Sequence, residues 1–203
     1  CARWDKAGVH FHPLFQLQLM GLNGAFLTAD LFNLFVFFEI MLAASYGLLL
    51  HGSGRQRVQA GLHYIAINLA ASSLFLVGVS MLYGITGTLN MADMAVRIAQ
   101  MPAEDTALLR TGAVLIILVF AIKAALVPLY FWLPRAYASA SAPVAALFAI
   151  MTKVGIYAIL RLATLMFGAG AGELAHLTQA WLWPLALATV ALGAVGVLAA
   201  RSL

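Results

Sequence analysis

The sequence predicts an all-α membrane protein, a bundle of about six transmembrane helices of which one is broken. The first observation is composition: of 203 residues, 64% are hydrophobic and only 9% are charged, and the mean hydropathy is +0.99. Soluble domains carry roughly a quarter charged residues, so this chain could not cover a surface that faces water. The second is that no long segment alternates apolar and polar residues as the strands of a membrane barrel do.

Six apolar segments are candidates for membrane helices, because a spanning helix needs about 20 largely apolar residues. The first of them is short and contains Gln16, Gln18 and Asn23. The tight turn at 28–30 predicts that it pairs antiparallel with the second. In chain order the predicted helices are 14–29, 31–50, 60–84, 111–131, 143–162 and 182–200.

The segment between the third and fourth helices predicts a short additional helix, at the membrane surface or packed on the bundle. Asn90 can accept hydrogen bonds at its N-terminus, and Asp93 at the third helical position favours the positive end of the helix dipole. The apolar residues fall loosely on one side: Leu89, Met91, Met94, Ile98 and Met101. An ordinary loop helix explains this pattern equally well.

Lysines and arginines in short loops indicate the side that faces the cytoplasm. With six crossings, one side holds three basic residues: Arg97, Arg110 and Arg161. The other side holds six: Arg3, Lys6, Arg55, Arg57, Arg135 and Arg201. The count places both chain ends, the loop before residue 60 and the junction before residue 143 in the cytoplasm.

Three ionisable residues lie where the helices should cross the middle of the bilayer. Glu39, Lys123 and Lys153 each fall close to the midpoint of a different predicted helix. At about 1.5 Å of rise per residue, each lies within roughly 3 Å of the midplane. Inserting one such charge costs about 2.5–3.5 kcal/mol, so three at one depth need an explanation.

A structural and a functional interpretation compete. In the structural one, Glu39 pairs with one lysine and joins two helices, but this leaves the second lysine without a role, and a buried ion pair seldom stabilises. The functional interpretation uses all three residues. Burial favours the neutral form of each group, and a carboxylate and two lysines connected by water can pass protons along. We therefore expect a proton or ion path and keep the structural clamp as the alternative.

Pro128 predicts a break in the fourth helix. It lacks a backbone N–H and disfavours helical geometry at the preceding residue, so we expect non-helical backbone within 124–129, with Lys123 at its edge. Broken membrane helices often mark ion sites, although a proline kink can also serve packing alone. Further polar side chains either line a hydrated route or join helices: Asn68, Ser72, Ser73, Tyr130 and Thr152.

Other classes of site lack support in the sequence. There is no phosphate-binding loop, no glycine-rich nucleotide turn and no cysteine cluster, so we expect no cofactor. His10 and His12 are too few for a metal site, and no block of Lys or Arg indicates nucleic acid. The expected surroundings are the lipid bilayer and other membrane subunits.

Three motifs closely resemble the D-type subunits of the multisubunit Na⁺(K⁺)/H⁺ antiporters, the class called Mrp, Pha, Mnh or Sha. Those subunits are similar to the antiporter-like proton-pumping subunits of respiratory complex I. The motifs are NLFVFFE, which ends at Glu39, IKAALVPLYFWLP, which contains Lys123 and Pro128, and LFAIMTKVGIYAILR, which contains Lys153. Arg135 departs from complex I relatives, which usually carry an acid there, and favours the antiporter branch.

The resemblance implies a fourteen-helix subunit in the bacterial inner membrane, built from two inverted five-helix repeats with one broken helix each. This chain would be a fragment of it, the first repeat and the helix that follows. The resemblance also implies that Glu39 and Lys123 form a coupling ion pair, and that Lys153 passes the proton towards the subunit centre. The implied partners are the other subunits of the antiporter complex, protons and Na⁺ or K⁺.

Two alternative functions stay open beside this ion transporter, which is not itself an enzyme. One is a proton-pumping subunit of complex I or of a membrane-bound hydrogenase. The other is a membrane scaffold, in which the charges only hold helices together.

The predicted topology can be tested by cysteine labelling in a cysteine-free background. Ser53 and Thr106 flank a single predicted membrane helix, so cysteines placed there should react with an impermeant maleimide from opposite sides, Ser53→Cys from the cytoplasm. Labelling of both positions from the same side would contradict six crossings.

Overall fold

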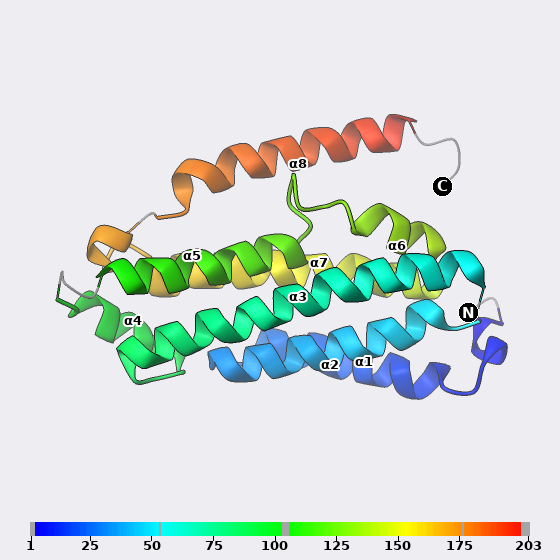
Figure 1. Cartoon of the computed structure of the whole chain (residues 1–203), viewed down its shortest axis with the longest axis horizontal. Helices are drawn as coiled ribbons and strands as arrows, with labels where there is room; N and C mark the ends of the chain where they lie inside the picture. The colour runs from blue at the N-terminus through cyan, green and yellow to red at the C-terminus, as the bar shows by residue number, and fades with distance from the viewer. Residues whose placement is uncertain (1–2, 53, 103–105, 176, 200–203) are drawn as a thin grey trace.

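The computed structural model describes residues 3–52, 54–102, 106–175 and 177–199, and these residues are almost entirely helical. Figure 1 shows an elongated bundle in which the long helices run along one direction and the last lies along its outside. The α-helices are α1 Phe11–Leu27, α2 Leu31–Leu50, α3 Arg55–Thr86, α4 Met91–Ala99, α5 Thr106–Lys123, α6 Leu133–Ser139, α7 Ala142–Arg161 and α8 Gln179–Ala199. Two short 3-10 helices, η1 Trp4–Ala7 and η4 Gly172–Leu174, and a π-helical extension of α7, η3 Leu162–Met166, complete the fold.

Five of the described helices are long and apolar enough to cross a membrane: α2, α3, α5, α7 with its extension η3, and α8. The sequence predicts six, and the difference is α1. Its 17 residues span about 25 Å, less than the roughly 30 Å of the hydrocarbon core. α1 nevertheless packs along α2 over its length, as the tight turn predicts.

Three glycines allow α1 and α2 to approach closely. A Cβ on Gly21 would lie 2.7 Å from the backbone nitrogen of Met41, and one on Gly24 would overlap the ring of Phe37. On the opposite helix, Gly47 makes room for Leu14. These three contacts fix the antiparallel register of the two helices.

α3 is longer than predicted, with 32 residues that begin at Arg55 and end at Thr86. It spans about 48 Å, so its polar first turns extend beyond the apolar core. Gly87 ends the helix with φ +66°, a left-handed conformation that glycine adopts without a steric penalty.

The predicted short helix is α4, and its cap is confirmed. The Asn90 side chain accepts hydrogen bonds from the backbone of Ala92 and Asp93 at 3.0 and 3.1 Å. Hydrogen bonds from Thr88 and Arg97 lower the pKa of Asp93, and Arg97 also forms an ion pair with it at 3.0 Å. The apolar side of α4 packs on the bundle against η3, with three residues buried: Met91, Met94 and Ile98.

The predicted break is also confirmed. α5 ends at Lys123, regular helix resumes only at Leu133, and Ala125 between them has φ +55°. Groups outside α5 satisfy the freed backbone: the Trp132 indole donates to the carbonyl of Ile122 at 3.0 Å. The N–H of Val127 donates to the hydroxyl of Thr189, on α8, also at 3.0 Å.

Gly155 of α7 should be essential to packing around this break. A Cβ there would lie 2.7 Å from the backbone nitrogen of Ala124, which a flexible side chain cannot relieve. We expect Gly155→Ala to lower the thermal unfolding temperature in detergent, because overpacking costs about 1–3 kcal/mol.

Gly84→Ala is the matched control, because a Cβ there meets nothing within 4 Å. Alanine is about 1 kcal/mol more favourable than glycine inside a helix, so this variant should unfold at the same or a higher temperature. Equal stabilisation by both substitutions would contradict the tight contact at Gly155.

Candidate functional site

Lys123 lies inside the bundle at the last residue of α5, and its side chain is only 4% exposed. Its Nζ donates hydrogen bonds to α3, to the hydroxyl of Ser72 at 2.9 Å and to the backbone carbonyl of Asn68 at 3.4 Å. The ammonium also lies 5.8 Å from the centre of the Phe38 ring, close enough for a cation–π attraction. Two acceptors one turn apart on α3 therefore hold this cation.

Ser72 connects Lys123 to Glu39. Its hydroxyl donates to Oε1 of Glu39 while it accepts from Lys123. In the part of the chain that the structure describes, no carboxylate oxygen lies within 4.0 Å of the lysine nitrogen. The two charges that the family resemblance pairs directly thus meet here through a serine.

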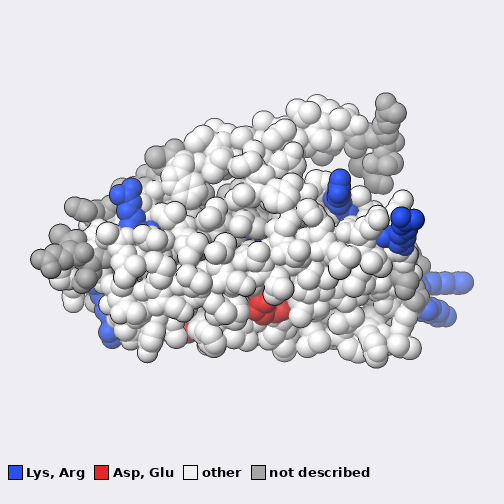
Figure 2. Space-filling model, in the orientation of Figure 1, with Lys and Arg blue, Asp and Glu red and all other residues white. Residues whose placement is uncertain are grey.

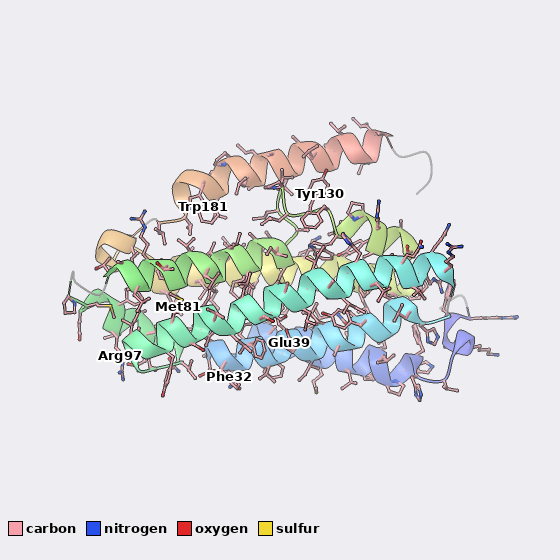
Figure 3. The ribbon with its side chains drawn as sticks, viewed as in Figure 1. Phe32, Glu39, Met81, Arg97, Tyr130 and Trp181 are labelled. Atoms are coloured by element: carbon pink, nitrogen blue, oxygen red, sulfur yellow. The ribbon has the colours of Figure 1, made fainter. Side chains whose placement is uncertain are left out.

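Glu39 is half-buried, at the edge of the bundle. Figure 3 labels it on α2 near the middle of the molecule, and Figure 2 shows an acidic patch at the same place on a face whose middle is otherwise uncharged. Its carboxylate therefore reaches both the buried hydroxyl of Ser72 and the outer surface of the described bundle.

Lys153 lies apart from these residues. Its side chain is exposed on the outer side of α7 and donates to the hydroxyl of the preceding, buried Thr152 at 3.3 Å. Because Gly155 touches Ala124, Lys153 is within about one helical turn of the depth of Lys123. The structure therefore joins Glu39 with Lys123, and α7 stands between this pair and Lys153.

The other predicted polar residues divide into two groups. Asn68 is buried, donates to the carbonyl of Tyr64 at 3.0 Å and offers its own carbonyl to Lys123. Ser73 is exposed and donates to Leu69 within its own helix. Pro128 and Tyr130 are exposed on the broken segment, where Figure 3 shows Tyr130 near α8.

Two buried polar features were not predicted from the sequence. The hydroxyls of Ser45 and Tyr64 lie 2.8 Å apart, and Ser45 donates to the carbonyl of Leu42 at 2.6 Å. Gln18 is wholly buried, and neither atom of its amide has a hydrogen-bond partner among the described residues. The available signal was the position of Ser45 and Gln18 inside mainly apolar helices.

Comparison with known families identifies the fold. Residues 28–203 match the family model described as NADH:quinone oxidoreductase/Mrp antiporter, transmembrane. The chain belongs to this family. One curated relative, the D-type subunit of a probable K⁺/H⁺ antiporter of Rhizobium meliloti strain 1021, is 59% identical over 202 residues. The match covers 100% of this chain and 38% of that relative, so the chain spans well under half of its length.

Solved structures of two membrane complexes contain similar chains. The Mrp complex from Dietzia sp. DQ12-45-1b matches with 43% identity and a TM-score of 0.69, over 76% of this chain and 29% of that one. The archaeal membrane-bound sulfane sulfur reductase matches with 37% identity and a TM-score of 0.72, over 82% of this chain and 34% of that one. The antiporter-like fold predicted from the motifs is thereby confirmed.

Ser72 should contribute measurably to stability. Ser72→Ala removes the acceptor for Lys123 and the donor for Glu39, and interhelical hydrogen bonds in membrane proteins contribute about 0.6–1.7 kcal/mol. We expect a loss of about 1–2 kcal/mol in the free energy of unfolding, measured by denaturant titration in mixed micelles. Ser73→Ala, the neighbouring exposed serine, should change it by less than about 0.5 kcal/mol. Equal effects would contradict the bridge.

Proposed function

We propose that this chain is the proton-conducting part of a subunit of a monovalent cation/proton antiporter in the bacterial inner membrane. The observation that carries the proposal is the chain of hydrogen bonds Glu39–Ser72–Lys123 inside an apolar bundle. The relative at 59% identity, named as a D-type antiporter subunit, supports it.

Ser72 suits proton transfer because its single hydroxyl donates to one partner and accepts from the other. When Ser72 gives its proton to the carboxylate of Glu39 and takes one from the ammonium of Lys123, the serine ends as it began. The result is a neutral carboxylic acid and a neutral amine in place of an ion pair. A poorly solvated interior disfavours separate charges, so the two arrangements can lie close in free energy.

Glu39 and Lys123 would then exchange protons with the rest of the route. Because Glu39 also reaches the outer surface of the described bundle, an approaching cation or a neighbouring subunit can change the stability of its charged form. When the carboxylate is stabilised as an anion, the proton returns to Lys123. When Glu39 is withdrawn, the ammonium loses its counter-charge and can release the proton onwards.

Lys153 is the proposed next station. Its ammonium already contacts the hydroxyl of Thr152, which is buried on the inner side of α7. A proton that leaves Lys123 would cross α7 at this level and reach the outer side of the helix, where Lys153 lies. In a longer subunit this side of α7 would face the rest of the protein.

A proton-pumping subunit of a respiratory complex is the second candidate, and the likeness to the sulfane sulfur reductase complex favours it. The proton route would be the same, and only the source of energy would differ. A scaffold role remains the structural alternative, in which the three charged groups hold helices without carrying protons.

The test is cation/proton exchange in everted vesicles that contain the complete complex, normalised to membrane-inserted protein. Lys123→Ala should abolish exchange driven by either Na⁺ or K⁺. Undiminished exchange in this variant would refute the relay. The respiratory alternative would be supported if the wild-type complex showed no cation-driven exchange and Lys123→Ala abolished its proton pumping.

Lys153→Arg separates proton transfer from charge. Arginine keeps the positive charge but stays protonated, with a pKa above about 12, so a relay residue cannot be replaced by it. We expect Lys153→Arg to reduce exchange nearly as far as Lys153→Ala. Lys6→Arg, the same change at an exposed position outside the bundle, should leave exchange unchanged. Substantial exchange in Lys153→Arg would contradict proton transfer through this residue.

A further inference from the structure

We propose that Tyr137, on α6, is a further residue of the proton route, and that its hydroxyl and that of Thr152 form a two-step relay that ends on Lys153. The proposal deepens the proton-conducting function argued above and rests on it. It gives Lys153 a supply of protons from the end of the bundle where α6 meets α7, in addition to the route from Lys123.

Tyr137 connects α6 to α7 through its hydroxyl. The hydroxyl donates to the backbone carbonyl of Phe148, and the rings of the two residues lie 5.8 Å apart. Phe148 lies inside regular helix, where its carbonyl also accepts from the backbone N–H four residues later. The tyrosine hydroxyl can therefore change its partner without leaving this carbonyl unpaired.

The hydroxyls of Tyr137 and Thr152 use neighbouring carbonyls of α7. Thr152 donates to the carbonyl of Ala149 at 3.3 Å, one residue after the carbonyl that accepts from Tyr137. The Thr152 side chain accordingly lies within hydrogen-bonding reach of the Tyr137 hydroxyl. Because Thr152 is only 7% exposed, little solvent can compete with Tyr137 for its hydroxyl.

Lys153 is the third group in this series. Among the described residues its ammonium has one hydrogen-bond partner, the hydroxyl of Thr152 at 3.3 Å. Side chains from α6 and α7 thus stand in the order Tyr137, Thr152, Lys153. With a rise of about 1.5 Å per residue along α7, the carbonyl group at residue 148 lies about 9 Å from the start of the helix, and Lys153 lies about 7.5 Å deeper.

The Tyr137 end of the series lies towards the predicted cytoplasmic side. The carbonyl of Ser139, the last residue of α6, accepts from the guanidinium of Arg57 at 3.0 Å. Arg57 is one of the basic residues that predict this side, and Figure 1 shows α6 at the same end of the bundle as the N-terminus. Tyr137 is half-buried two residues before Ser139, so part of its side chain stays open to a proton donor.

The observed hydrogen bonds show the relay closed. An ammonium on Lys153 has no lone pair, so Thr152 accepts from it and turns its own proton to Ala149. Tyr137 likewise turns its proton to Phe148. A neutral amine on Lys153 can accept from Thr152, and Thr152 then has a lone pair for Tyr137. The relay therefore opens only while Lys153 lacks a proton.

The proton transfer through the open relay balances. The amine nitrogen of Lys153 takes the hydroxyl proton of Thr152, so that an N–H bond forms as an O–H bond breaks. Thr152 takes the proton of Tyr137, and Tyr137 takes one from a hydronium ion at its open edge. One hydronium becomes water and one amine becomes ammonium, whereas both hydroxyls end as they began.

The first test is Tyr137→Phe in the complete complex, which keeps the ring and removes the hydroxyl. A tie between helices alone predicts unchanged exchange per inserted protein. Our proposal predicts that the maximum rate falls at least five-fold while the cation concentration for half-maximal exchange is unchanged, because the relay carries only protons. Tyr83→Phe is the matched control, because Tyr83 is exposed on α3. An undiminished maximum rate in Tyr137→Phe would overturn the proposal.

The second test removes the middle hydroxyl. Thr152→Val should slow exchange as Tyr137→Phe does, whereas Thr152→Ser keeps a hydroxyl and should retain exchange. Thr111→Val is the control, because the exposed Thr111 also donates to a carbonyl of its own helix, at 2.9 Å. The double variant Tyr137→Phe/Thr152→Val should be no slower than the slower single variant, because both interrupt one series. Multiplied losses, or equal slowing by serine and valine, would overturn the relay.

Failure of this relay is separable from failure of the proposed function. If Lys123→Ala abolishes exchange and Tyr137→Phe does not slow it, the route through Lys123 stands and the supply through Tyr137 is refuted. If Lys123→Ala leaves exchange undiminished, the proposed function itself fails.

Discussion

The placement of one ammonium group in an apolar bundle determines much of this structure. Lys123 cannot reach water, so acceptors must surround it, and α3 supplies them from residues 68 and 72, which share one face because they are four apart. Ser72 then passes the interaction on to Glu39. Three helices, α2, α3 and α5, are thus tied together at a single depth by one cation.

α5 ends at the residue that carries this cation. In a continuous helix the backbone N–H and C=O groups around residue 124 would bond to one another. The break turns the chain away, so other elements must satisfy these groups. The Trp132 indole and the Thr189 hydroxyl do so, and Gly155 lets α7 pack directly on the broken backbone. The break is therefore held by specific contacts, and the lysine at its edge is held with it.

Sequence could predict the parts of this fold that depend on chain chemistry alone. The bounds of α2 follow from a mainly apolar run after Asp30, which caps the helix by accepting from the N–H of Asn33. The break follows from Pro128, which has no N–H to donate. The start of α1 and the extra turns of α3 could not be predicted, because polar flanks lack the apolar signal that marks a span.

The direction in which each side chain points was harder to predict from the sequence than the position of the helices. Helices that are apolar all round give no preferred face, so the pattern that orients a soluble amphipathic helix is missing. Sequence placed Glu39, Lys123 and Lys153 at one depth but could not show that Ser72 separates the first two, or that Lys153 points away from them. Rotation about a helix axis depends on contacts with neighbouring helices, which only the structure describes.

For the same reason, the polar residues are the most informative part of such a bundle. In a bilayer no water compensates a buried polar group, so each one should bond to another group. Asn68, Ser72, Ser45 and Thr152 all obey this rule within the described residues. Gln18 does not. Among the described residues its amide is thus an exception, and its cost of about 1–3 kcal/mol is offset by the close packing of α1 on α2 around it.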